Sequence, residues 1–212
     1  MNIFDMLSHY KQAYADAIAH SYEQLCVITK EANDSKVYES LMIEMIKHFE
    51  SFEPTPQPDP LGIPTVGYGH VVTGGEPAYP WTKDQGATIL LEELEKRYVP
   101  SAKAAWNSKP GKLWRVEEWD LLAPWVRAGI VSAVYNGGPA IITTCSWPQR
   151  ATDDEAGSYF YKYSTGRDRS TGRRIRLAGL VRRRFCEWHL MTKAELDFEP
   201  LGWREWYNTH KL

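Results

Sequence analysis

Apolar residues recur at intervals of three and four along the first fifty residues, a spacing that predicts two amphipathic helices. The first apolar stripe, within residues 2–32, consists of Ile3, Leu7, Tyr10, Tyr14, Ile18, Tyr22, Leu25 and Ile28. Asn33-Asp34-Ser35 interrupts the pattern and suits a helix N-cap. The second stripe consists of Val37, Tyr38, Leu41, Met42, Met45, Ile46 and Phe49. The first helix must bury its stripe either against the rest of the chain or against a partner.

Residues 54–75 break the helical pattern and are rich in proline and glycine. Between these turn-forming residues stand Ile63, Val66, Tyr68 and Val71, whose side chains favour short strands. The segment therefore predicts a small twisted hairpin. Proline cannot donate a ladder hydrogen bond, so the proline-bearing strand should lie at an edge or be irregular.

Further helices follow the hairpin. Thr82 and Gln85 form a capping box, so a helix is expected over residues 83–98. A Trp- and Leu-rich stretch over residues 116–135 should belong to the core and be kinked or divided at Pro124. Two more helices are expected at residues 151–163 and 177–192, joined by an arginine-rich loop. The aromatic tail, residues 201–212, should pack back on the domain.

The length of 212 residues allows one domain with a real core, plus an extension. A net charge of −2 gives no overall attraction to polyanions, so nucleic acid is not an expected partner. The exception is local, since Thr165 to Arg184 holds eight arginines and one acid, Asp168. This cluster predicts either binding to an anionic surface or pairing with acids elsewhere in the fold, and the pattern favours neither.

Targeting and redox signals are few. Cys26, Cys145 and Cys186 show no metal-ligand spacing and suit a reducing compartment, with a single disulfide left open. The N-terminus lacks the features of a signal peptide, and no apolar run approaches the roughly 20 residues of a membrane span. We therefore expect a protein made in the cytoplasm without stable membrane insertion.

Candidate chemistry concentrates between Phe49 and His70. No nucleophile elbow, phosphate-binding loop or metal-binding histidine motif is present, which leaves carboxylate chemistry. Glu50 ends the second helix, where the helix dipole disfavours an anion unless it has a partner or a role. Asp59 follows nine positions later and Thr65 six beyond that. Two carboxylates facing each other across a bond, with a hydroxyl to hold water, suit glycoside hydrolysis.

The run I-K-H-F-E-S-F, continued by D-P-L-G-I-P-T-V-G-Y-G-H, resembles the N-terminal motif of the phage-type lysozymes, glycoside hydrolase family 24. Glu50, Asp59 and Thr65 match both intervals of that motif. Weaker similarity continues in W-T-K-D-Q, in V-S-A-V-Y-N-G-G and in L-A-G-L-V-R-R-R-F-C-E, so that it covers about residues 41–192. The chain departs from the motif at Ser51, where glycine is usual, and in the prolines before Asp59.

The resemblance implies an α+β, mostly helical lysozyme-like fold, with a small β-hairpin lobe, a larger helical lobe and an active-site cleft between them. Residues 1–40 would be an N-terminal helical extension and residues 41–212 the catalytic domain. Glu50 would be the general acid, Asp59 the second carboxylate and Thr65 the residue positioning water. The substrate would be the β-1,4 bond between N-acetylmuramic acid and N-acetylglucosamine in bacterial peptidoglycan, cleaved with inversion by a phage endolysin.

Several roles stay open beside this expectation. Tyr68, Tyr135 and Asn136 are candidate substrate contacts, although Tyr135 and Asn136 could simply end a helix. His70 suits a structural partner inside the hairpin better than a catalytic base, and one of Arg182, Arg183 and Arg184 could pair with Glu50. No metal or other cofactor is expected, and the protein should be a monomer unless the N-terminal helix mediates pairing. It would reside in the host cytoplasm until release to the cell wall. A lytic transglycosylase and a non-catalytic wall-binding protein are the alternatives.

Overall fold

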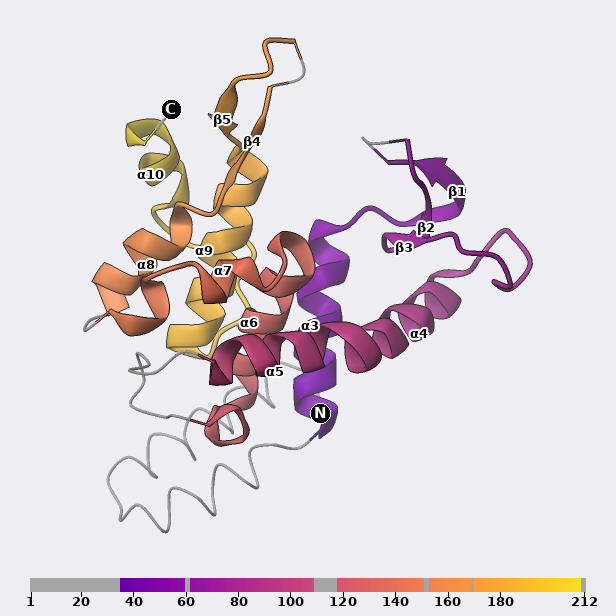
Figure 1. Ribbon diagram of the computed structural model, residues 1–212, viewed down its shortest axis with the longest axis horizontal. Coiled ribbons are helices and arrows are strands. Elements are labelled where there is room, and N and C mark those ends of the chain that lie inside the picture. Colours follow the sequence, from indigo (N-terminus) through magenta and orange to yellow (C-terminus); the bar gives the residue numbers. More distant parts are fainter. Residues whose placement is uncertain (1–34, 60–61, 109–117, 151–152, 169, 211–212) are drawn as a thin grey trace.

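The computed structural model describes residues 35–59, 62–108, 118–150, 153–168 and 170–210 (Figure 1). The predicted helix at residues 2–32 and Cys26 lie outside these ranges, and so does most of the proposed extension. The described helices are α3 (Ser35–Phe49), α4 (Lys83–Glu93), α5 (Val99–Asn107), α6 (Pro124–Gly137), α7 (Ala140–Thr143), α8 (Asp153–Tyr161), α9 (Ala178–Lys193) and α10 (Trp203–Thr209). The strands are β1 (Glu53–Pro58), β2 (Pro64–Gly67), β3 (His70–Val71), β4 (Thr165–Arg167) and β5 (Arg174–Arg176).

Helix α6 forms the centre of the helical lobe. Its residues from Pro124 to Val134 are all buried, and it packs against α3 on one side and α9 on another. Pro124 lies in the first turn, where its missing N–H costs nothing, so it divides the predicted helix and starts α6. The preceding residues form a short 3-10 turn, Trp119–Leu121, instead of helix. The fold is the expected mostly helical α+β arrangement.

The β lobe is a three-stranded antiparallel sheet in the order β1-β2-β3. Strand β1 carries Pro54, Pro56 and Pro58 and lies at the edge, as its missing backbone donors predict. Its pairing with β2 is irregular between Glu53 and Gln57. The sheet contacts α4, which begins with the predicted capping box of Thr82 and Gln85. A π-helical turn, Leu94–Tyr98, joins α4 to α5 without a break in the helical path.

One expectation about the C-terminal part differs from the structure. The arginine-rich segment was expected to be a loop, but it forms an antiparallel hairpin in which Thr165 pairs with Arg176 and Arg167 with Arg174. The β-branched Thr165 and Ile175 favour extended backbone on these two short strands. The aromatic tail packs back as predicted, since Trp206 of α10 contacts Tyr161 and Phe185. Cys145 and Cys186 are buried free thiols, so no disulfide joins them.

His70 connects the β lobe to α4. Its Nδ1 lies 2.9 Å from Oε1 of Glu93, and its Nε2 lies 3.5 Å from Oε1 of Glu76. The predicted structural role of His70 agrees with this position. None of the described helices combines the length and the apolar character that crossing a membrane requires.

Candidate active site

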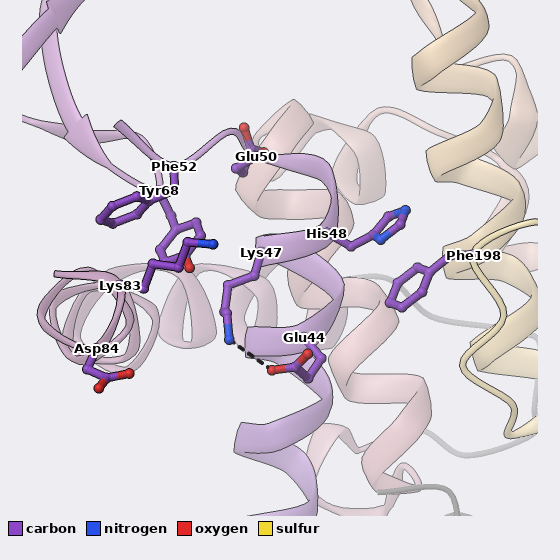
Figure 2. A pocket seen from close by; sticks show the side chains of 9 residues that line it. All are labelled: Glu44, Lys47, His48, Glu50, Phe52, Tyr68, Lys83, Asp84 and Phe198. Carbon is purple, nitrogen blue, oxygen red and sulfur yellow. Dashed lines mark hydrogen bonds and ion pairs between the residues drawn. The ribbon is translucent and has the colours of Figure 1, made fainter. Parts of the chain in front are cut away.

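Glu50 directly follows α3, at the junction between the helical lobe and the sheet. Its backbone N–H still donates to the carbonyl oxygen of Ile46 at 2.9 Å, so the last helical turn fixes the position of the residue. Its side chain is 27% exposed. In Figure 2 the Glu50 carboxyl group points away from the ion pair that Lys47 and Glu44 form. The carboxyl group is thus held in place and remains accessible.

Glu50 pairs with Arg183 of α9. The sequence alone did not distinguish Arg183 from Arg182 and Arg184 as this partner. Nη1 of Arg183 donates to Oε1 of Glu50 at 2.5 Å, and its Nε donates to Oε1 of Glu187 at 3.1 Å. The same Glu187 oxygen accepts from the hydroxyl of Ser132 on α6 at 2.7 Å. Because Glu187 is fully buried and Arg183 is 3% exposed, this network anchors Glu50 to the core.

Arg184 extends the network to the end of α6. Its Nη1 lies 3.0 Å from Oε2 of Glu187, and its Nη2 donates to Oδ1 of Asn136 at 2.6 Å. Burial lowers the pKa of Arg184 to about 10, so the guanidinium keeps its charge at neutral pH. Two arginines thus balance two carboxylates. Asn136 is exposed, and since its oxygen accepts from Arg184, its NH₂ group is the part left to donate.

Tyr135 joins the two lobes beside Glu50. Its hydroxyl donates to the carbonyl oxygen of Tyr68 at 2.7 Å, and its ring contacts that of Tyr98. Burial, with the nearby Glu50 carboxylate adding to it, raises the pKa of Tyr135. Gly69 permits this approach, since its φ is +97° and a Cβ there would lie 3.1 Å from the Tyr135 hydroxyl.

Asp59 and Thr65 lie on the β1–β2 hairpin. Oδ1 of Asp59 accepts from the backbone N–H of Ile63 at 2.8 Å, and this bond shapes the turn. The hydroxyl of Thr65 donates to the carbonyl oxygen of Gln57 across the hairpin at 3.3 Å. Toward a water molecule Thr65 would therefore act as an acceptor.

A pocket of about 500 Å³ adjoins Glu50 (Figure 2). Its lining consists of Glu44, Lys47, His48, Glu50, Phe52, Tyr68, Lys83, Asp84 and Phe198. Of the predicted site residues the pocket includes Glu50 and Tyr68, whereas Asp59, Thr65, Tyr135 and Asn136 lie outside its lining. Tyr68 is 5% exposed, which leaves little of its ring accessible to a ligand in this conformation.

Two parts of the site were not predicted from the sequence. The stacked rings of His48 and Phe198, 3.8 Å apart, line the pocket at the end away from the sheet (Figure 2). Burial and the neighbouring Arg182 lower the pKa of His48. The buried pair of Ser132 and Glu187 was also missed, although the spacing of Arg183 and Glu187 on one helix is a recognisable signal. Within the described ranges, no group of three or more His, Cys, Asp or Glu side chains could hold a metal ion.

Comparison with known proteins identifies the family. A partly exposed carboxyl group at a helix–sheet junction, in a mostly helical α+β protein, is the arrangement of a lysozyme-like enzyme. The family model described as phage lysozyme matches residues 47–187, more than half of the chain, and the chain belongs to this family. It is accordingly a glycoside hydrolase of the lysozyme class that acts on peptidoglycan.

Solved structures share the fold at low sequence identity. The muramidase domain of SpmX from Asticaccaulis excentricus is 21% identical, with a TM-score of 0.56, and the match covers 71% of this chain and 94% of that one. An endolysin from an Escherichia coli O157:H7 phage, FAHEc1, is 21% identical, with a TM-score of 0.59 and coverage of 74% and 94%. A P22 lysozyme variant is 21% identical, with a TM-score of 0.51 and coverage of 72% and 95%. Among curated proteins no sequence matches this chain.

Proposed function

We propose that this protein hydrolyses the β-1,4 bond between N-acetylmuramic acid and N-acetylglucosamine, with Glu50 as the general acid. The observation that carries the proposal is the position of Glu50. It is the accessible member of a buried charge network and lies at the junction of the two lobes. A general acid must reach the glycosidic oxygen and yet be fixed in direction, and this position meets both needs.

The role of Arg183 follows from its contacts. It contacts both Glu50 and the buried Glu187, so the core fixes the position of the guanidinium beside Glu50. When Glu50 gives its proton to the leaving oxygen, the new carboxylate finds the guanidinium already in place. Such preorganised charge costs no rearrangement at the moment of reaction.

Asp59 and Thr65 would serve the attacking water in an inverting mechanism. Asp59 would accept a proton from the water, while the oxygen of Thr65 would accept its second hydrogen bond and set its direction. Both side chains come from one hairpin, and backbone bonds hold each of them. Inversion predicts that the first product has the α configuration at its new reducing end, which NMR of the early reaction mixture would reveal.

Asn136 would bind the acetamido carbonyl of a sugar, because it is exposed and Arg184 occupies its oxygen, which leaves its NH₂ group to donate. Tyr68 and Tyr135 would contribute mainly by bridging the lobes, given the hydrogen bond between them. We also propose that the protein acts as a phage endolysin, made in the host cytoplasm and released to the wall as a monomer.

The test is Glu50→Gln, with Glu53→Gln as the matched control. Glu53 lies three positions along, on the exposed edge strand, and has no part in the charge network. Loss of a general acid should slow the lysis of permeabilised bacteria about 10²- to 10⁴-fold, while the control keeps the wild-type rate. A wild-type rate in the Glu50 variant would refute the assignment.

Product analysis separates the alternatives. A lytic transglycosylase would release 1,6-anhydro sugars, which are lighter by one water in mass spectrometry, whereas the proposed enzyme releases reducing ends. Binding to peptidoglycan without any loss of turbidity, unchanged by Glu50→Gln, would instead indicate a non-catalytic wall-binding protein.

A further inference from the structure

The arginine-rich segment divides into two groups with different surroundings. On α9, Arg182, Arg183 and Arg184 each pair with a carboxylate. Arg182 binds Glu199 at 2.7 Å, and the other two share Glu187. This half of the segment is therefore neutralised within the fold.

On the β4–β5 hairpin the charges are not neutralised. Arg167, Arg173 and Arg174 are exposed, and within the described ranges none of them forms an ion pair. The acid of the hairpin, Asp168, accepts hydrogen bonds from Ser170 and Thr171 in its own turn. The hairpin therefore presents an unneutralised cationic surface.

A pocket of about 200 Å³ lies at the base of this hairpin. Its lining consists of Gly137, Ala140, Ile141, Thr144, Tyr163, Thr165 and Arg174. Nε of Arg174 donates to Oγ1 of Thr165 at 2.8 Å, which fixes the plane of the guanidinium. Its two remaining NH₂ groups have no acceptor among the described residues. A cation, hydroxyl groups and the apolar Ile141 suit a carboxylate carried on a short alkyl group.

The pocket at the base of the hairpin begins at the C-terminal end of α6, next in sequence to a residue that contacts the charge network. Gly137 directly follows Asn136, which Arg184 holds beside the charge network. In Figure 1 the β4–β5 and β1–β2 hairpins project to the same side of the molecule, and the C-terminal end of α3 lies between them in that view.

We propose that Arg174, with Arg173 and Arg167 on the same hairpin, binds a carboxylate of the peptide stem that N-acetylmuramic acid carries. This inference rests on the proposed function and adds a second point of substrate recognition on the helical lobe. It gives a role to the arginines of the hairpin, which form no ion pair among the described residues. The proposed ligand is a carboxylate on the substrate itself, because the pocket begins at Gly137, which directly follows Asn136.

The experiment compares two forms of purified peptidoglycan. In both, the free amines are acetylated, and in one the carboxylates are also converted to methylamides. Arg174→Gln should lower kcat/KM for release of reducing ends about 5- to 10-fold on the carboxylate form, chiefly through KM. On the amidated form the same variant should match the wild type. Arg174→Lys should give a kcat/KM on the carboxylate form between those of Arg174→Gln and the wild type, because lysine keeps the charge but loses the paired donors.

Lys103→Gln is the charge-matched control. Lys103 is an exposed cation on α5, paired with Asp120, and its loss should leave both rates unchanged. An equal loss on both forms of peptidoglycan, or no loss on either, would overturn the proposal. Unchanged hydrolysis with lost binding to phosphatidylglycerol vesicles would assign the hairpin to a lipid surface and would also overturn it. Failure of the proposed function is distinct, since the wild type would then release reducing ends from neither form.

Discussion

Replacing Arg183 with methionine tests whether the buried charge network holds the site together. The variant removes the guanidinium that joins Glu50 and Glu187 and keeps a side chain of similar length. Glu187 is fully buried, so it cannot regain water after its partner is lost. It keeps Arg184 at 3.0 Å and the hydroxyl of Ser132 at 2.7 Å.

Removal of one partner from a buried ion pair costs about 3–5 kcal/mol. The contacts that remain to Glu187 place the expected loss near the lower end, about 3 kcal/mol. For a protein of this size that loss lowers Tm by about 6–12 °C. The cost falls mainly on Glu187, because Glu50 is 27% exposed and water can replace part of its interaction.

Urea unfolding followed by the fluorescence of the nine tryptophans measures the loss directly. Arg182→Met is the matched control. Arg182 is the preceding residue on α9 but is 31% exposed and pairs with the exposed Glu199, so its replacement should cost less than about 1 kcal/mol. Equal, small losses in the two variants would refute the idea that the network anchors the site.

Two further variants test hydrogen bonds outside the network of Glu50, Arg183 and Glu187. Tyr135→Phe leaves the carbonyl oxygen of Tyr68 without its donor and should cost about 1–2 kcal/mol in calorimetry, with a lower kcat, whereas unchanged values would contradict the bridging role. Hydrogen bonds, foremost from the backbone of Thr73, hold the pKa of Glu76 at about 2, below the ordinary 4.5. A lowered pKa means that the carboxylate stabilises the fold above about pH 4.5, and that this stabilisation is lost as pH falls toward 2. Glu76→Gln should therefore lower Tm at pH 7 and match the wild type near pH 2, and a pH-independent difference would contradict this cause.

Local sequence patterns predicted most of the elements that position the site. The apolar stripe that ends at Phe49 predicted α3 and placed Glu50 at its end. The prolines of β1 predicted an edge strand, and the capping box at Thr82 predicted the start of α4. These predictions succeeded because each depends on neighbouring residues, through hydrogen bonds, fixed φ angles or helical periodicity. The spacing of Glu50, Asp59 and Thr65 could likewise be recognised from the sequence, because all three lie within one short segment.

The arginine-rich segment shows where local patterns stop being sufficient. Its composition predicted a local positive charge but did not show whether acids elsewhere in the fold pair with the arginines. The structure pairs Arg182, Arg183 and Arg184 and leaves Arg167, Arg173 and Arg174 of the hairpin without ion pairs among the described residues. The difference depends on which acids other elements bring near, and spacing along the chain does not contain that information.

The sequence by itself therefore determined α3, the start of α4, the edge strand and the identity of the acidic residue between the two lobes. Only the tertiary structure decided that Arg183, rather than its two neighbours, pairs with that acid, since the two residues are 133 positions apart. It also decided that Glu187 and Ser132 support the pair from the core. The physical reason is that the energy of a buried ion pair depends on exclusion of water, and packing of α3, α6 and α9 against one another provides that exclusion.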